Sequence, residues 1–178
     1  SLKGLIFGKE FNQPIDEVKW PEALEKIIFG YNFNQSLDNV KWPETVEKII
    51  LGGGFNNSLD NIKWPKFLKV LHLINNLNGN IENVKWPDSL NSIIFMGNFD
   101  QPIDNIKWPN SIKKIEFGSN FDQPLENVKW PESLQTIVFG DDFEKRIDYV
   151  KWPPSIRKIE FGNNFCQKLD NVKWPDSL

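Results

Sequence analysis

Hydrophobic residues recur along this chain with a period of 22 residues. In one unit Leu24, Ile27 and Phe29 are apolar, and the last two are separated by a single residue. Side chains two positions apart lie on the same side of an extended chain, so this spacing predicts a short strand with one face inward. We expect the strand to end near Gly30, and the same pattern predicts one such strand in every unit.

The rest of each unit has more apolar positions but little room for a helix. In the same unit these positions are Phe33, Leu37, Val40 and Trp42, and Pro43 follows directly. The stretch is short and contains Asn and Pro, which favours a 3₁₀ turn or extended chain. A residue before proline is itself biased toward extended conformations. We therefore predict little or no long α-helix.

Tryptophan marks the period most clearly. Each of the 8 tryptophans follows a Lys and precedes a Pro, with no insertion or deletion between units: Trp20, Trp42, Trp64, Trp86, Trp108, Trp130, Trp152 and Trp174. Such a repeat predicts a solenoid, in which each unit packs on its neighbours and equivalent residues stack as ladders. We expect a single domain over residues 1–178, with eight 22-residue turns and one short parallel β-strand per turn. The tryptophans should be buried; an exposed platform for carbohydrates or nucleobases is the alternative.

Short motifs recur within the unit. Phe-Asn-Gln-Pro-Ile occupies residues 11–15, Phe-Asp-Gln-Pro-Ile occupies 99–103, and the segment 24–32 reads Leu-x-x-Ile-x-Phe-x-x-Asn. With Trp-Pro-x-Ser-Leu and the 22-residue period, these motifs resemble FNIP repeats, a branch of the leucine-rich-repeat superfamily known from social amoebae and from giant viruses of amoebae. The resemblance covers the whole chain. It implies a solenoid of leucine-rich-repeat type that binds other proteins and has no catalytic residues.

The resemblance also implies a cellular role. In giant viruses an FNIP array often follows an F-box, which makes the array the substrate-recruiting part of a ubiquitin-ligase adaptor. Residues 1–178 contain no F-box. The sequence therefore predicts a protein–protein interaction module, and the link to an F-box-type adaptor rests on the resemblance alone.

Composition and charge argue against several kinds of partner and binding site. The chain carries 21 Lys and Arg against 24 Asp and Glu, a net charge of −3, which argues against nucleic acid as a partner bound through bulk charge. No apolar run is long enough for a membrane span and no signal-peptide pattern is present. We expect a cytoplasmic protein, in the host cytoplasm if the source is viral, with no membrane partner. One cysteine, Cys166, and one histidine, His72, exclude a disulfide framework and make a zinc site unexpected.

Charged residues also follow the period. An acidic residue precedes a lysine by three positions in every unit, and a row of metal ions or a phosphate track is one interpretation of these columns. Because each acidic residue has a lysine in its own turn, we expect two charge ladders that screen each other. We predict no metal, no cofactor and no catalytic residue. The acidic column is Asp16, Asp38, Asp60, Glu82, Asp104, Glu126, Asp148 and Asp170.

Two uncharged columns have structural explanations. Asparagines near the strand ends should form a hydrogen-bonded ladder to the backbone of the turns: Asn32, Asn76, Asn98, Asn120 and Asn164. A glycine column indicates either a positive φ or a close backbone approach: Gly8, Gly30, Gly52, Gly118, Gly140 and Gly162.

Binding should use outward strand positions, because these vary between units while the inward columns do not. The outward positions of the middle units form an apolar patch rimmed by charge, which is typical of a protein-binding site. The alternative is that β-branched residues at these positions are simply good strand formers. The unit around Phe67 and Leu77 departs most from the consensus. The predicted partner-binding residues are Ile28, Ile50, Val70, His72, Ile74, Ile94, Met96 and Glu116.

The two chain ends suggest a second function. The chain begins and ends at the same phase of the repeat, with Ser-Leu at each end and no polar cap. Solenoids use such caps to stay soluble, so we expect a fragment of a longer protein. The runner-up function is a self-associating structural element that stacks head to tail into a filament or scaffold.

Overall fold

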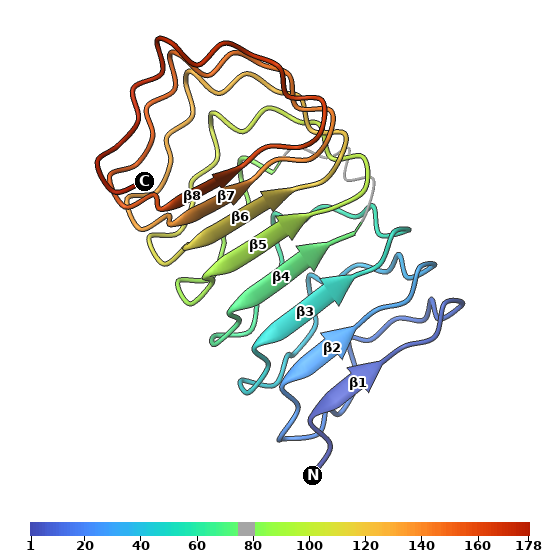
Figure 1. Ribbon diagram of the computed structural model, residues 1–178. Coiled ribbons are helices and arrows are strands. Elements are labelled where there is room, and N and C mark those ends of the chain that lie inside the picture. The colour runs from blue at the N-terminus through green and yellow to red at the C-terminus, as the bar shows by residue number, and fades with distance from the viewer. Residues whose placement is uncertain (75–80) are drawn as a thin grey trace.

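A computed structural model describes residues 1–74 and 81–178. Its eight strands form one parallel sheet in chain order, and the loops of the successive turns stack behind it (Figure 1). No helix occurs in the described residues, so the predicted solenoid with one short parallel strand per turn is confirmed. The strands are β1 (Gly4–Ile6), β2 (Lys26–Ile28), β3 (Lys48–Leu51), β4 (Val70–Leu73), β5 (Ser92–Phe95), β6 (Lys114–Phe117), β7 (Thr136–Val138) and β8 (Lys158–Glu160).

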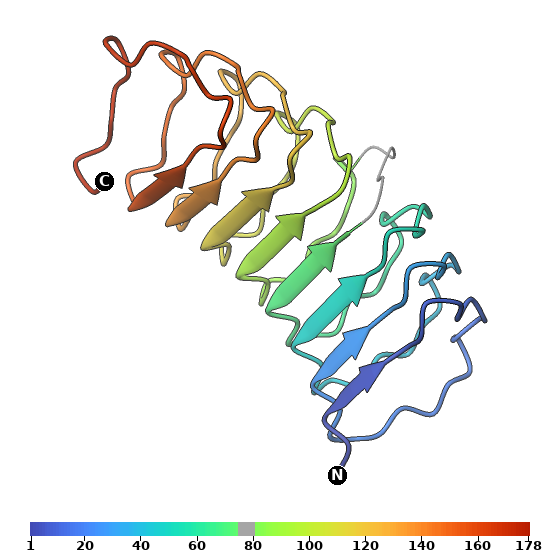
Figure 2. The same cartoon turned by 45° about the vertical axis from the view of Figure 1, so that its right-hand side comes forward.

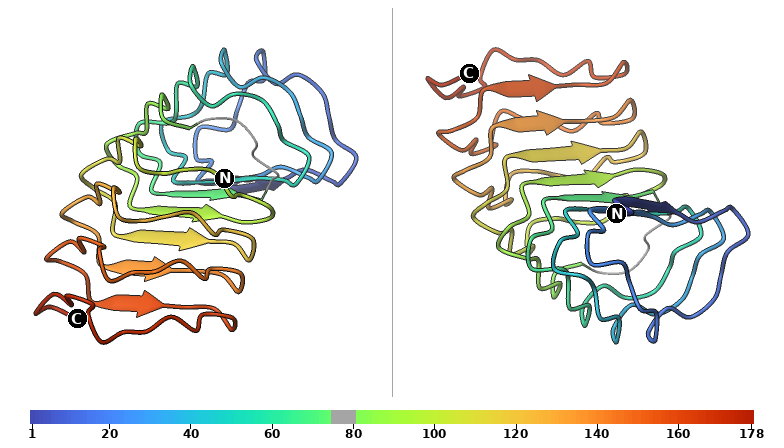
Figure 3. Two further views of the ribbon diagram at one scale, coloured as in Figure 1. Left: turned by 90° about the horizontal axis from the view of Figure 1, so that it is seen from above. Right: turned by 90° about the horizontal axis from the view of Figure 1, so that it is seen from below.

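The termini lie at opposite ends of the array (Figure 2). Seen from above and from below, the N-terminal turns appear as open loops and the C-terminal turns are nearly edge-on, so the turns rotate progressively along the molecule (Figure 3). Such rotation follows from the right-handed twist of neighbouring strands. The outward face of the sheet is therefore continuous from β1 to β8 but changes direction along its length.

The strand register follows directly from the repeat. Ile27 pairs with Ile49, and Ile49 pairs with Leu71, so equivalent residues of neighbouring turns lie side by side. These three side chains point inward and are fully buried. Residues one position later point outward, because successive side chains of a strand alternate between faces. The constant period thus places every inward and outward column in line across the sheet.

The core consists of stacked ladders, as predicted. Phe121 lies between Phe99 and Phe143, with ring centroids 6.1 and 6.2 Å apart. Each stacked aromatic pair contributes about 0.5–1.5 kcal/mol beyond the burial of its area. Asn76 and Leu77, which belong to two of the predicted columns, lie outside the described residues.

The tryptophans belong to this core. Indole rings of adjacent turns stack face to face, as in the pair Trp130 and Trp152, whose centroids are 6.4 Å apart. Of the eight tryptophans, only Trp174 of the last turn is exposed. Rings that cover one another cannot also form an open platform for sugars or bases, so the core interpretation is correct. The indole N–H groups of seven tryptophans are buried and find no hydrogen-bond acceptor among the described residues: Trp20, Trp42, Trp64, Trp86, Trp108, Trp130 and Trp152.

The glycine column reflects close backbone approach. A Cβ atom on Gly52 would lie 2.1 Å from the carbonyl oxygen of Gly30, and the same clash recurs at Gly140 and Gly162. Among the described residues the one glycine with a positive φ is Gly97, which lies outside this column. The turns therefore need glycine here because neighbouring backbones touch.

The asparagine ladder runs two positions after the predicted column, which contains Asn32. Asn12 Oδ1 accepts a hydrogen bond from the backbone N–H of Asn34 (2.9 Å), and Asn34 Oδ1 accepts one from the N–H of Asn56 (2.8 Å). Asn32 instead donates to the carboxylate of Glu10. The ladder still ties each turn to the next, but through a different asparagine column.

Candidate protein-binding face

The structure brings four of the predicted residues into one outward row across β2–β5. Ile28 pairs in register with Ile50, Ile50 with His72, and His72 with Ile94. All four are half-buried, because each is flanked by its neighbours in the row. Ile6 of β1 continues the row and is largely exposed. The row is apolar apart from one imidazole ring.

Ile74 and Met96 form a ridge at the end of β4 and β5. They are 37% and 40% exposed and occupy the column that is glycine in other turns. Hydrogen bonds from their backbone N–H groups to Leu51 and Leu73 hold them beside the preceding turn (3.0 and 2.8 Å). The equivalent positions of the turns before and after them are Gly52 and Gly118. The side chains of Ile74 and Met96 therefore project from a surface whose neighbouring positions have no side chain.

Tyr31 extends this ridge and was not among the predicted binding residues. The ring is 59% exposed. A Cβ atom on Gly53 would lie 2.6 Å from Cε2 of Tyr31 and 3.3 Å from the carbonyl oxygen of Ile74. Gly53 thus leaves room for the ring between two turns. The glycine run at 52–54 was the available signal, since three glycines in one loop indicate that something large lies against it.

Phe67 lies at the opposite end of β4, where the chain enters the strand. It is 48% exposed, and Lys66 Nζ lies 5.4 Å from its ring centroid. Most other turns have serine or threonine in this column, and the hydroxyl donates to a carbonyl of the preceding turn, as Ser89 does to Leu68 (2.8 Å). Phenylalanine makes no such bond. The sequence marked Phe67 as unusual but did not place it in the site.

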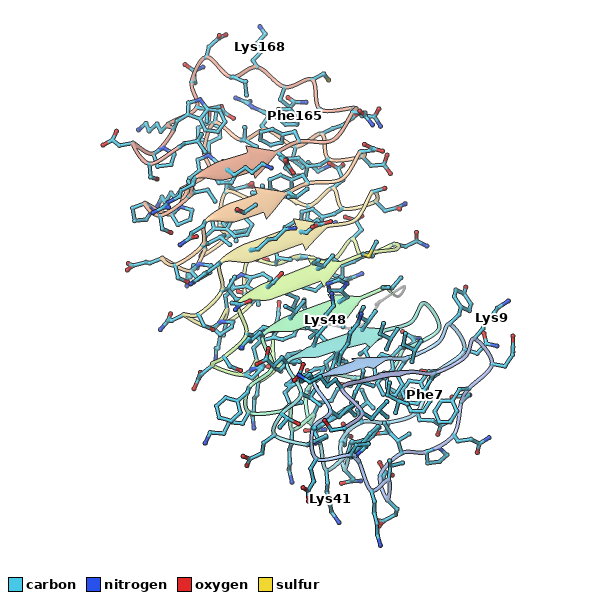
Figure 4. All side chains as sticks on the ribbon, turned by 60° about the horizontal axis from the view of Figure 1, so that its bottom comes forward. Phe7, Lys9, Lys41, Lys48, Phe165 and Lys168 are labelled. Carbon is cyan, nitrogen blue, oxygen red and sulfur yellow. The ribbon has the colours of Figure 1, made fainter. Side chains whose placement is uncertain are left out.

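Two lysines flank the row at the strand entry. Lys26 and Lys48 are register neighbours on β2 and β3, and Figure 4 shows Lys48 on the sheet. No ion pair to either lysine occurs within residues 1–74 and 81–178. The nearby carboxylates of Glu25 and Glu47 are engaged with other lysines, at 2.7 and 2.6 Å.

The remaining predicted residues lie at the border of the patch. Val70 occupies on β4 the position that Lys48 has on β3, and it is half-buried. Glu116 on β6 pairs in register with Ile94, and its Oε2 lies 2.7 Å from Lys114 Nζ. Glu116 therefore ends the apolar row with an internally neutralised pair.

His72 occupies the centre of the row. Burial lowers the pKa of its imidazole below the ordinary value, and the ammonium of Lys48 lowers it further, while Glu116 acts in the opposite direction. The side chain is therefore neutral at pH 7. A neutral imidazole adds hydrogen-bonding capacity to an otherwise apolar surface without adding charge.

The structure shows no chemical centre elsewhere among the described residues. No group of three or more His, Cys, Asp or Glu side chains is arranged to hold a metal ion in residues 1–74 and 81–178. One member of the acidic column, Asp148, forms an ion pair with Arg146 and not with the lysine three positions later; the mutual screening of the two columns stays a prediction. Within this part of the chain there is also no helix of the length and apolarity that a membrane span requires.

The chain is similar to a known repeat family and to solved repeat structures. The FNIP Repeat model matches residues 1–32, 11–54, 78–120, 99–142 and 121–163. No curated protein matches the chain. CroV588, a giant-virus protein described as a novel circular LRR protein structure, is 31% identical, with a TM-score of 0.61 over 99% of this chain and 32% of its own.

A leucine-rich repeat protein from Bacteroides ovatus is 16% identical, covers 96% of this chain and 44% of its own, and has a TM-score of 0.28. The chain spans only 32% of the length of CroV588. The family matches together cover most of the sequence, in the same phase as the strands and the tryptophan ladder. The chain belongs to the FNIP-repeat family of leucine-rich-repeat-like solenoids.

Proposed function

We propose that this chain is a protein-binding module that holds a protein partner on the outward face of β2–β5. The observation that supports this most directly is the continuity of the apolar surface, from the row Ile28–Ile50–His72–Ile94 to the ridge of Ile74 and Met96. Apolar patches that are rimmed by charge are typical of interaction sites. FNIP solenoids are a typically non-catalytic family, which fits a binding role.

The size of the patch indicates the strength of binding. Burying one isoleucine side chain contributes about 1.5–3 kcal/mol, so four apolar anchors supply about 6–12 kcal/mol against an association cost of about 4–15 kcal/mol. The apolar surface alone therefore supports weak binding. A stable complex needs polar contacts from the charged rim as well.

The finer form of the proposal is that the bound partner is a substrate, and that the array recruits it for an F-box-type ubiquitin-ligase adaptor. This form is supported by the FNIP family alone. It predicts that a fusion of the chain to an F-box recruits the protein bound on the strand face to a ubiquitin ligase, so that this protein becomes ubiquitinated.

Affinity capture from amoeba lysate tests the binding face. The wild-type chain and an Ile50→Asp/Ile94→Asp variant serve as baits, with Val138→Asp as the matched control, because Val138 is an outward residue of β7 beyond the patch. We expect a protein that the wild type and the control retain and the double variant loses. Circular dichroism of each bait confirms folding. A partner that the double variant retains equally well contradicts the proposal.

A second candidate function is self-association. It rests on the identical outline of the turns: equivalent residues of successive turns pack in register, so a turn of one copy would pack in the same way on a turn of another and continue the sheet. Sedimentation at increasing concentration tests this: mass that rises with concentration supports stacking, and a constant monomer mass contradicts it.

A further inference from the structure

We infer that the segment bound by the strand face is an extended peptide of about five residues in which carboxylates alternate with large apolar side chains, spanning β2–β5 at about 4.8 Å per strand. The inference rests on the proposed function and adds the chemistry of the partner. It follows from three features of the face: two lysines that form no ion pair within the described part of the chain, an apolar row beside them, and an apolar ridge on the far side.

The first feature is a pair of adjacent lysines on β2 and β3. Lys26 and Lys48 are direct register neighbours, and parallel strands lie about 4.8 Å apart, so two like charges are placed side by side. On β6 and β8 the equivalent lysines are neutralised by a glutamate two residues later on the same strand. On β2 and β3 that position is Ile28 or Ile50. Among residues 1–74 and 81–178, therefore, no carboxylate pairs with the positive charge on this part of the face.

The field of these lysines extends over the apolar row. The pKa of His72, in the middle of the row, is lowered first by burial and then by the ammonium group of Lys48, with smaller contributions from Lys114 and Lys26, while Glu116 raises it. A carboxylate of a partner placed beside Lys48 would relieve the repulsion between the lysines. Charge complementarity of this kind selects acidic partners and disfavours basic ones.

The spacing of the surface fits an extended chain that crosses the strands. From β2 to β5 there are three strand intervals, about 14 Å in all, which about four to five extended residues span. Successive side chains of such a peptide point in opposite directions. With the peptide backbone over the row, one set of side chains points toward Lys26 and Lys48 and the other toward Tyr31, Ile74 and Met96. The first set requires carboxylates and the second requires apolar groups.

Selection from a random peptide library displayed on phage tests this without assuming a sequence. The full chain is the bait, in three forms: wild type, Lys26→Gln/Lys48→Gln, and the control Lys41→Gln/Lys63→Gln. The control lysines belong to the exposed basic column, and Figure 4 shows Lys41 among the loops and not on the sheet. Glutamine keeps much of the side-chain length and removes the charge.

We expect the wild type and the control to enrich peptides in which Asp or Glu alternates with Leu, Ile, Phe or Met. The Lys26→Gln/Lys48→Gln bait should lose the acidic preference. Fluorescence anisotropy of the consensus peptide should show affinity reduced about tenfold or more by the double glutamine variant, because a desolvated charge pair is lost. The control should change it less than about twofold, as expected for an exposed charge away from the site.

Enrichment of basic or uncharged peptides, equal enrichment by both glutamine variants, or no enrichment at all would overturn the inference. Its failure is distinguishable from failure of the proposed function. If Ile50→Asp/Ile94→Asp abolishes partner capture while Lys26→Gln/Lys48→Gln leaves capture and selection unchanged, the binding face stands and the acidic peptide does not. If Ile50→Asp/Ile94→Asp leaves capture intact, the face itself is wrong.

Discussion

The two halves of the sheet share their inward side chains and differ on their outward face. In β2–β5 the central outward residues are isoleucine or histidine, whereas β6 and β8 have Glu116 and Glu160 there. Each glutamate pairs with the lysine two residues before it on its own strand. The lysines of β6 and β8 are thus neutralised within their own strands, whereas those of β2 and β3 form no ion pair among the described residues and lie beside apolar groups. Because the core ladders are alike, the fold does not require this difference, which supports the proposed partner-binding face.

The turns of β4 and β5 differ from the others in the residue that follows the strand. Ile74 follows β4 and Met96 follows β5, whereas the other turns have glycine at this position, and most of these glycines pack closely against the backbone of the preceding turn. A turn can therefore be built with or without a side chain at this position. Turns with one gain an exposed apolar group, and turns without one pack their backbones closer together.

The largest effect is expected from placing a side chain at one of the closely packed glycines, such as Gly140 of the C-terminal half. In Gly140→Ala the new Cβ would lie 2.2 Å from the carbonyl oxygen of Gly118, and backbone has to move to accommodate it. We expect a loss of about 3 kcal/mol or more in the free energy of unfolding, in the range of severe strain. Met96→Gly, the reverse change in the other half, should lose only about 1 kcal/mol. Urea unfolding measures both, and equal stability of Gly140→Ala and wild type would refute the close-packing explanation.

A smaller effect of opposite sign is expected at Phe67. The turn at Phe67 has the same backbone hydrogen bond as the turn at Ser89, whose hydroxyl donates to Leu68. Phe67→Ser should therefore gain a hydrogen bond to the carbonyl of Val46, worth about 0.5–1.5 kcal/mol, and should weaken partner binding. Ser133→Ala is the matched loss, since Ser133 donates to Ile112 (2.6 Å). If Phe67→Ser lowers the unfolding midpoint, the aromatic ring supports the fold and not a partner.

The smallest effect concerns the pH dependence contributed by His72. Its pKa is lowered in the folded state, so the unfolded state binds more protons in this range and stability rises with pH. The contribution is present above the unfolded pKa of about 6.5 and is lost as pH falls through the lower, folded pKa. The difference between wild type and His72→Gln in urea midpoint, measured from about pH 7.5 to about pH 5.5, isolates this group from the carboxylates. A difference that stays constant with pH would contradict it.

Most of the fold follows from the sequence because the period never changes. Once Ile27 and Ile49 are recognised as equivalent, the register, the inward ladders and the outward row through Ile50 and His72 are determined. The exposed rings of Tyr31 and Phe67 were not predicted as part of the site, since their positions depend on how the loops pass one another. The ion pair of Asp148 was missed for a similar reason, since its partner Arg146 occurs in one turn only and does not follow the repeat.

The connectivity of the strands gives the molecule a mechanical character. Among the described residues each strand contacts only its immediate neighbours along the chain, so a pulling force applied to the two termini unfolds one turn at a time and not the structure as a whole. Every turn holds the same number of residues, and releasing one adds about 70 Å of extended chain. A single molecule stretched between its ends should therefore lengthen in even steps, one turn at a time, and shorten in the same steps when the force is relaxed.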